Sequence, residues 1–182
     1  PALPVTSFAE DAAGRVWLGT PRGLVAWGED GAFEVAEGLM GQRIASLTAY
    51  DAAFARVLDA AGCDFILVGD SVGMVVQGRA TTIPVTVDDI IYHTRLVARG
   101  TERALLMADM PFMSYSSAAD CLRNAARLMK EGGAEIVKLE WGELQIDMVY
   151  RLTECGIPVC AHLGLTPQAI LNNGPAICEG TG

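Results

Sequence analysis

The chain has 182 residues, of which 51% are hydrophobic and 19% are charged, a composition that favours a packed core over disorder. Its net charge of −9 argues against nucleic acids and anionic membranes as partners. No apolar run approaches the roughly 18 residues that a membrane span needs. Residues 1–14 show neither the basic nor the apolar region of a signal peptide. We therefore expect a cytoplasmic protein.

Five cysteines are present, an odd number, and no two of them form a CxxC pair. A metal site at Cys155 and Cys160 would need a second ligand pair, and the sequence offers none. Most of the cysteines lie in apolar or helical patterns, so we predict reduced thiols that pack as small core side chains. They are Cys63, Cys121, Cys155, Cys160 and Cys178.

Residues 1–38 differ in pattern from the rest of the chain. Short β-favouring runs alternate with Gly and Asp turns, which predicts a small antiparallel meander. The string EDAAGRVWLGTPRGLVAW resembles one blade repeat of the regulator-type β-propellers of two-component sensors. A single blade cannot bury its own faces. The alternative is a hairpin that belongs to the main domain, which we place at residues 39–182.

From residue 39 onward, predicted strands and helices alternate. Glycines mark most helix ends, and Thr86 with Asp89 predicts a capping box. Residues 73–84 are predicted to be a functional loop. The expected strands cover 43–51, 65–69, 104–108, 135–139 and 157–164, and the expected helices cover 51–61, 86–100, 117–131 and 143–155, with another helix starting at TPQAI.

Acidic residues stand at the ends of three successive predicted strands, as Asp70, Asp109 and Glu140. The carboxyl ends of parallel strands meet at one edge, where ligands bind. Three carboxylates there would repel one another unless a cation lies among them. Carboxylate oxygens suit Mg²⁺, so we predict a magnesium site at these residues, although a single strand-end Asp could instead cap the next helix.

Other polar residues lie beside these acids. Lys138 shares a strand face with Glu140 and could pair a substrate carboxylate or form a structural ion pair. Ser71 could bind a substrate carboxylate or cap a helix. His162 is a possible site residue at the end of the last predicted strand, whereas His93, in mid-helix, is interpreted as structural.

Strands that alternate with helices pair in parallel through right-handed crossovers, which defines an α/β fold. The periodicity does not distinguish an open doubly wound sheet from a barrel. Acids on a single rim favour the barrel. We therefore predict about five strands of a (β/α)₈ barrel, preceded by the short antiparallel β segment.

Six segments carry a resemblance to a known family. Across residues 42–171 the chain resembles ketopantoate hydroxymethyltransferase, also called 3-methyl-2-oxobutanoate hydroxymethyltransferase. The segments, in order, are LTAYDAAFA, FILVGDSVGMVVQG, TTIPVTVDDIIYHT, LLMADMPFMSY, EIVKLEWG and VCAHLGLTPQ.

The resemblance implies a (β/α)₈ barrel that forms cytoplasmic homo-oligomers. It implies transfer of a hydroxymethyl group from 5,10-methylenetetrahydrofolate to 3-methyl-2-oxobutanoate, which gives 2-dehydropantoate in pantothenate synthesis. By motif it assigns Mg²⁺ to Asp70, Asp109 and Glu140. It assigns substrate contacts to Asp70, Ser71, Asp109 and Lys138.

The chain also departs from the family pattern. The family continues through three further strands, and its general base is a glutamate on a later strand that no residue here matches. Residues 172–182 lack the family's glycine-rich continuation. We therefore expect a truncated form, weakly active or inactive, with two open strand edges that favour self-association.

Two alternatives remain at this point. One is another Mg²⁺-dependent enolate enzyme of the phosphoenolpyruvate mutase and isocitrate lyase superfamily, against which the six ordered segments argue. The other is a non-catalytic piece, either a sensor module or a fused barrel fragment.

Overall fold

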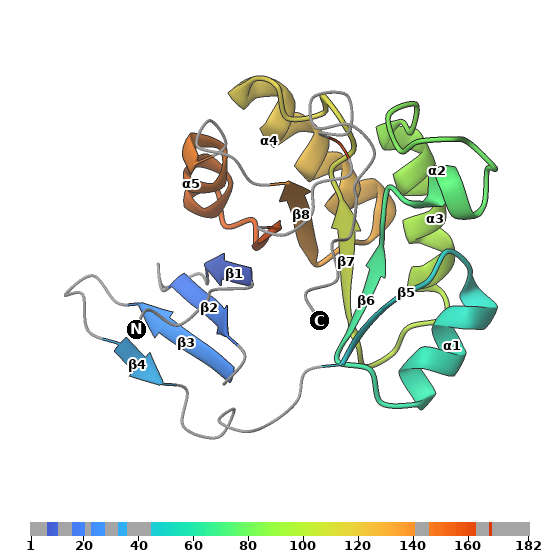
Figure 1. Cartoon of the computed structure of the whole chain (residues 1–182), viewed down its shortest axis with the longest axis horizontal. Helices are drawn as coiled ribbons and strands as arrows, with labels where there is room; N and C mark the ends of the chain where they lie inside the picture. The colour runs from blue at the N-terminus through green and yellow to red at the C-terminus, as the bar shows by residue number, and fades with distance from the viewer. Residues whose placement is uncertain are drawn as a thin grey trace, which may run out of the picture.

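The computed structural model describes residues 7–10, 16–20, 23–27, 33–35, 45–140, 146–162 and 168. Their strands form one sheet in the order β4-β3-β2-β1-β9-β8-β7-β6-β5 (Figure 1). The sheet has two parts, an antiparallel part from β4 to β1 and a parallel part from β9 to β5.

The parallel part confirms the predicted α/β class. Each strand pairs in parallel with the next one along the chain, and helices lie between successive strands. The strands are β5 (Ser46–Thr48), β6 (Phe65–Val68), β7 (Leu105–Asp109), β8 (Ile136–Glu140) and β9 (Val159–His162). The helices are α1 (Ala52–Ala60), α2 (Val72–Val75), α3 (Val87–Ala98), α4 (Ala118–Arg127), the π-helical turn η1 (Leu128–Gly132) and α5 (Ile146–Glu154).

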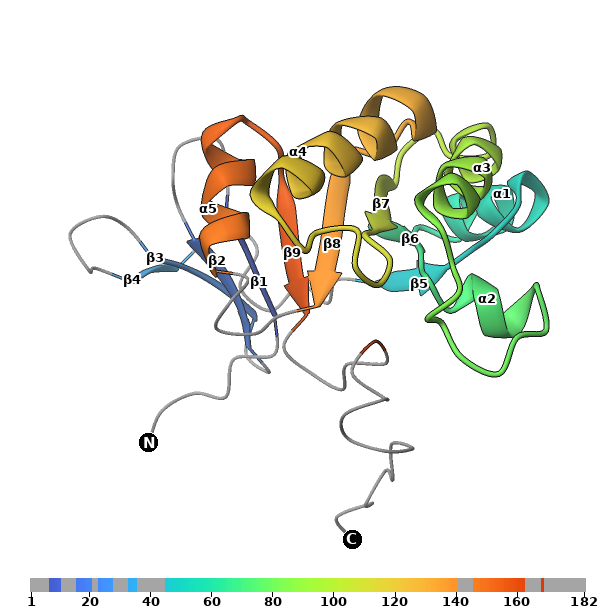
Figure 2. The same ribbon diagram turned by 90° about the horizontal axis from the view of Figure 1, so that it is seen from above.

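The longer helices α1, α3, α4 and α5 lie along one side of the parallel strands (Figure 2). The hydrophobic core fills the space between these helices and the parallel strands. Strands β6 and β8 contribute alternate buried residues such as Ile66 and Val137, and the helices contribute Ile90, Val97 and Leu152. Burial of such aliphatic side chains is the main stabilising contribution to this layer.

Side-chain caps set where the helices begin. Thr86 and Asp89 form the predicted capping box of α3, and Ser117 caps α4 by accepting from the backbone N–H of Asp120. The first parallel strand is shorter than predicted, since Asp51 caps α1 by accepting from Ala53 N and Phe54 N. The N–H of Ala49 still donates to the carbonyl of Leu67 at 3.1 Å, and the helix begins two residues later at the cap.

The predicted loop over 73–84 begins with a helical turn. Helix α2 covers Val72–Val75, and the N–H of Val76 donates to the carbonyl of Val72 at 2.9 Å. The prediction of a loop throughout 73–84 was therefore wrong at its start. Val72 is fully buried in the core while Val75 and Val76 are exposed, so the turn is held by its first residue and by local backbone bonds.

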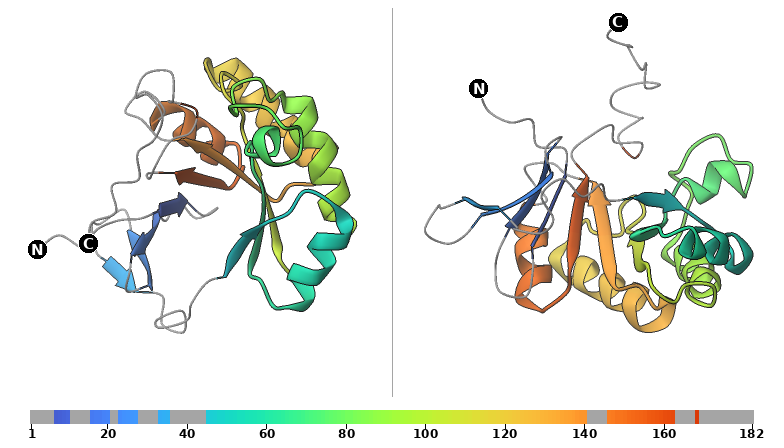
Figure 3. Two further views of the ribbon diagram at one scale, coloured as in Figure 1. Left: turned by 45° about the vertical axis from the view of Figure 1, so that its right-hand side comes forward. Right: turned by 90° about the horizontal axis from the view of Figure 1, so that it is seen from below.

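The N-terminal segment is the antiparallel meander that its sequence predicts. It contains β1 (Ser7–Glu10), β2 (Val16–Thr20), β3 (Gly23–Trp27) and β4 (Phe33–Val35). Strand β1 also pairs with β9 in antiparallel register, from Ser7 opposite His162 to Glu10 opposite Val159 (Figure 3). The expected open edge at the last parallel strand is thus covered, and that expectation was wrong. Whether 1–38 and 39–182 are separate domains stays a prediction.

At the other end of the sheet, no described strand pairs with the outer side of β5. Leu47, in the middle of β5, is 53% exposed. An exposed strand edge with an apolar side chain is a template for pairing with another chain.

The cysteines only partly match the predicted core role. Cys63 and Cys121 are buried, Cys160 is half-buried and Cys155 is exposed, and all four are free. The prediction was wrong for Cys155, which follows the C-terminal end of α5 and faces solvent. Cys178 lies outside the described residues. Among the helices that the structure describes, none has the length and apolar character needed to cross a membrane.

Candidate functional site

Three buried acids meet at the carboxyl ends of β6, β7 and β8, as predicted. Asp70, Asp109 and Glu140 are 5%, 4% and 8% exposed. The backbone N–H of Asp70 donates to Oδ2 of Asp109 at 3.0 Å. Gln168 links Glu140 to Asp70. Its side chain donates to Asp70, and its backbone N–H donates to Glu140. The parallel register of three neighbouring strands therefore builds one acidic rim.

Gly69 makes the approach of Asp109 possible. A Cβ at this position would lie 2.9 Å from Oγ of Ser71 and 3.3 Å from Oδ2 of Asp109. A side chain would therefore push against the carboxylate that accepts from Asp70. The Gly-Asp pair at the end of β6 gives the rim its close packing.

Lys138 provides a positive charge at the rim. Its Nζ donates to Oδ1 of Asp109, and the two side chains are 16% and 6% exposed. Burial opposes the charged ammonium, but the carboxylates of Asp109 and Asp70 outweigh that effect and raise the pKa of Lys138. The structure shows the ion pair with Asp109, and pairing of Lys138 with a substrate carboxylate stays a prediction.

Burial raises the proton affinity of two of these acids. Burial, followed by the charge of Asp109, raises the pKa of Asp70 to about 6. Burial, with a further contribution from the charge of Asp70, raises the pKa of Glu140 to about 7. Both carboxyl groups thus hold protons more tightly than in water, mainly because burial disfavours their charged form and secondarily because a neighbouring carboxylate adds negative charge.

Gln168 is a site residue that the sequence analysis did not single out. Its Nε2 donates to Oδ2 of Asp70 at 2.9 Å and to the carbonyl of Met110 at 3.1 Å. Its Oε1 accepts from the hydroxyl of Tyr115 at 2.6 Å. Burial, then the charge of Glu140, raises the pKa of Tyr115, so this phenol remains a donor. The segment VCAHLGLTPQ ends at Gln168, but nothing in its pattern connects it with acids elsewhere in the chain.

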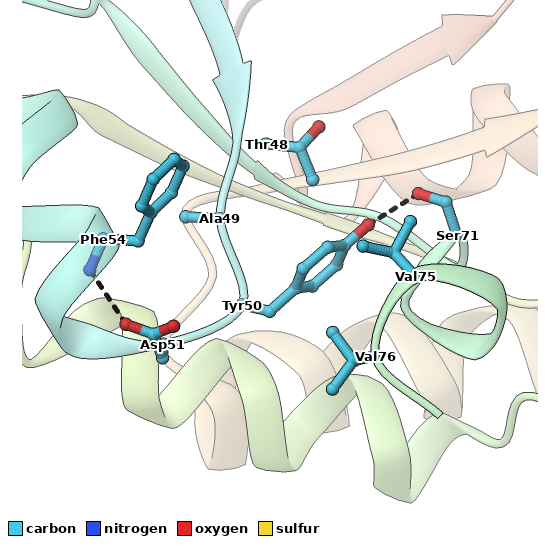
Figure 4. A pocket seen from close by; sticks show the side chains of 8 residues that line it. All are labelled: Thr48, Ala49, Tyr50, Asp51, Phe54, Ser71, Val75 and Val76. Atoms are coloured by element: carbon cyan, nitrogen blue, oxygen red, sulfur yellow. Dashed lines mark hydrogen bonds between the residues drawn. The ribbon is translucent and has the colours of Figure 1, made fainter. Parts of the chain in front are cut away.

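Ser71 faces a pocket next to the rim. Its Oγ lies 2.7 Å from the hydroxyl of Tyr50, and the two side chains point toward each other (Figure 4). The cavity measures about 480 Å³, within the range of small-ligand sites. It is lined by Thr48, Ala49, Tyr50, Asp51, Phe54, Ser71, Val75 and Val76. Tyr50 was not predicted as a site residue.

The two histidines lie in different places. Nδ1 of His93 lies 2.8 Å from the carbonyl of Tyr50, which agrees with the structural role expected for it. His162 is half-buried at the end of β9, in register with Glu140 of β8. The fold thus brings His162 to the acidic rim, while its part in the site stays a prediction.

Within the described residues, no three His, Cys, Asp or Glu side chains form a ready-made metal cluster. The rim acids instead hold Lys138 and Gln168. Three buried carboxylates do supply the hard oxygen ligands that Mg²⁺ prefers. The assignment of Mg²⁺ to Asp70, Asp109 and Glu140 stays a prediction.

A family model described as ketopantoate hydroxymethyltransferase matches residues 36–181. The chain belongs to this family. The match confirms the family inferred from six sequence segments. It also extends past them to include residues 172–181, which were thought to depart from the family pattern.

Curated relatives carry the name of the same family. Proteins named 3-methyl-2-oxobutanoate hydroxymethyltransferase from Alkalilimnicola ehrlichii and Halorhodospira halophila are 62% and 59% identical over 130 residues. These residues are 71% of this chain and 47% of each relative, so the chain spans about half the length of the relatives it matches. A solved structure of 2,3-dimethylmalate lyase, a member of the PEP mutase and isocitrate lyase superfamily, aligns with a TM-score of 0.45 at 20% identity, covering 53% of this chain and 34% of its own.

Proposed function

We propose that this chain carries the metal-binding and keto-acid-binding half of a hydroxymethyltransferase. The substrate would be 3-methyl-2-oxobutanoate, which accepts a hydroxymethyl group from 5,10-methylenetetrahydrofolate to give 2-dehydropantoate. The observation that carries the proposal is the convergence of Asp70, Asp109, Glu140 and Lys138 on one rim. Family membership supports the choice of substrates.

The acidic and basic residues of the rim would bind different parts of the metal–substrate complex. Asp70, Asp109 and Glu140 would hold Mg²⁺, which when bound polarises the keto group and stabilises an enolate. The ammonium of Lys138 would pair with the substrate carboxylate, and the hydroxyl of Ser71 would donate a hydrogen bond to it. The cavity beside Ser71, with valine and phenylalanine walls, offers space next to the reacting groups.

General-base catalysis contributes about 10²–10⁴-fold, and no described residue has been assigned that role. Binding of Mg²⁺ and of the keto acid is therefore the more sensitive test of the proposal.

Replacing Asp109→Asn is expected to abolish most Mg²⁺ binding, since it removes one of three ligands at the centre of the rim. Calorimetric titration of Mg²⁺ into the parent and the variant measures this. The matched control is Asp88→Asn, which makes the same charge change on a side chain that is 77% exposed and pairs with Arg127. Equal Mg²⁺ affinity in the parent and Asp109→Asn would refute the metal assignment.

Replacing Lys138→Met is expected to weaken keto-acid binding by roughly 1.5–3 kcal/mol, the range for a hydrogen bond to a charged group. Titration of 3-methyl-2-oxobutanoate in the presence of Mg²⁺ measures this. Lys130→Met, at an exposed position, is the control for lost charge. If Lys138→Met lowers the melting temperature sharply while keto-acid binding is kept, Lys138 is only the structural partner of Asp109.

We also propose that the chain forms homo-oligomers, as the family resemblance implies, with the free edge of β5 as one contact. Leu47→Lys should shift the chain toward smaller species in light scattering, because a charge on an edge strand opposes edge-to-edge pairing. Tyr150→Lys, at an apolar position 64% exposed on α5, is the control. An unchanged size distribution for Leu47→Lys would exclude the β5 edge as a contact.

The cytoplasm is the compartment that we propose for the chain. Cys63, Cys121, Cys155 and Cys160 are all free thiols, which is typical of a reducing environment. Finding these four thiols in disulfides in protein taken directly from cells would contradict this location.

A further inference from the structure

The donors of Gln168 are bonded to carboxylate oxygens of two of the three rim acids. The side-chain Nε2 lies 2.9 Å from Oδ2 of Asp70, and the backbone N lies 3.2 Å from both carboxylate oxygens of Glu140. Gln168 is 6% exposed, so these bonds lie within the protein interior. One residue thus satisfies two of the three acids of the rim.

The orientation of the amide follows from its partners. The carbonyl of Met110 and the carboxylate of Asp70 only accept hydrogen bonds at neutral pH, so the group that faces them must be the NH₂. The other end of the amide accepts from the hydroxyl of Tyr115 at 2.6 Å. Gln168 is therefore held with its donors toward the acids and its carbonyl away from them.

The third acid is also fully engaged. Oδ1 of Asp109 accepts from Lys138, and Oδ2 accepts from the backbone N–H of Asp70. Every acid of the rim thus accepts a hydrogen bond from a neighbouring donor.

We propose that Gln168 is a built-in competitor for the cation at this rim, which stabilises the metal-free site and must release Asp70 before Mg²⁺ can bind. The inference rests on the proposed metal site. A carboxamide is a neutral donor, so it compensates the acids less well than a divalent cation and can be displaced. Gln168 accordingly sets the Mg²⁺ concentration at which the site fills.

Gln168→Ala is the variant that tests this role. It removes the side-chain donors but keeps the backbone N–H, and water can replace the lost amide. Mg²⁺ should then bind about three- to tenfold more tightly in calorimetric titration, the range that corresponds to one net hydrogen bond. In EDTA the variant should melt at a lower temperature than the parent, and saturating Mg²⁺ should raise its melting temperature by more.

Two further variants separate this role from a general effect of lost packing. Tyr115→Phe removes the bond that holds the carbonyl of Gln168, so it should tighten Mg²⁺ binding in the same direction but less. Asn124→Ala removes a carboxamide that donates to the carbonyl of Ser114 at 2.7 Å, away from the acids, and should leave Mg²⁺ affinity unchanged.

Weaker Mg²⁺ binding by Gln168→Ala would overturn the proposal, because it would show that Gln168 positions the ligands for the metal. Equal binding by the parent and Gln168→Ala would overturn it too, yet would leave the metal site itself intact. If neither chain binds Mg²⁺, both this inference and the proposed metal site fail. Binding by the variant alone would support competition most strongly.

Discussion

The site depends on the repulsion among three carboxylates that the parallel sheet forces together. Their strands are neighbours, so the chain cannot separate Asp70, Asp109 and Glu140 without breaking the register of β6, β7 and β8. The helices on one side of the strands remove the core from water and make each negative charge more costly. Whatever neutralises these acids therefore determines the state of the whole rim.

Two side chains donate to these acids, and they differ in kind, since Lys138 is charged and Gln168 is neutral. Lys138 comes from β8 itself and is in register with Asp109, so its position is fixed by the sheet. Gln168 reaches the rim from beyond β9 and is 98 positions from Asp70 in the sequence. The ion pair thus joins two neighbouring strands at the rim. The amide is the group whose loss makes room for a cation.

Much of this arrangement could be predicted from the sequence, because it follows from local patterns. The apolar runs placed β6, β7 and β8, and the acid at the end of each run placed the rim. Thr86 and Ser117 marked the starts of α3 and α4 through capping, which depends on residues only three positions apart. The rest depends on contacts between distant segments. Gln168, the Tyr50–Ser71 contact and the pairing of β1 with β9 have no periodic or spacing signal, and the turn α2 interrupts a stretch whose composition is typical of a loop.

The central claim is that the rim buries carboxyl groups whose charged form is destabilised, and the pH dependence of stability tests it most directly. Raised pKa values, about 6 for Asp70 and about 7 for Glu140, mean that the folded chain binds more protons than the unfolded chain between about pH 4 and pH 7. In EDTA the free energy of unfolding should therefore fall as pH rises through this window, by roughly 1–2 kcal/mol between pH 5 and pH 8 after allowance for solvent screening. Mg²⁺ should restore the loss at pH 8, and Glu140→Gln should flatten the profile. A metal-free stability that is flat or rises from pH 5 to pH 8, unaltered by Glu140→Gln, would contradict the account.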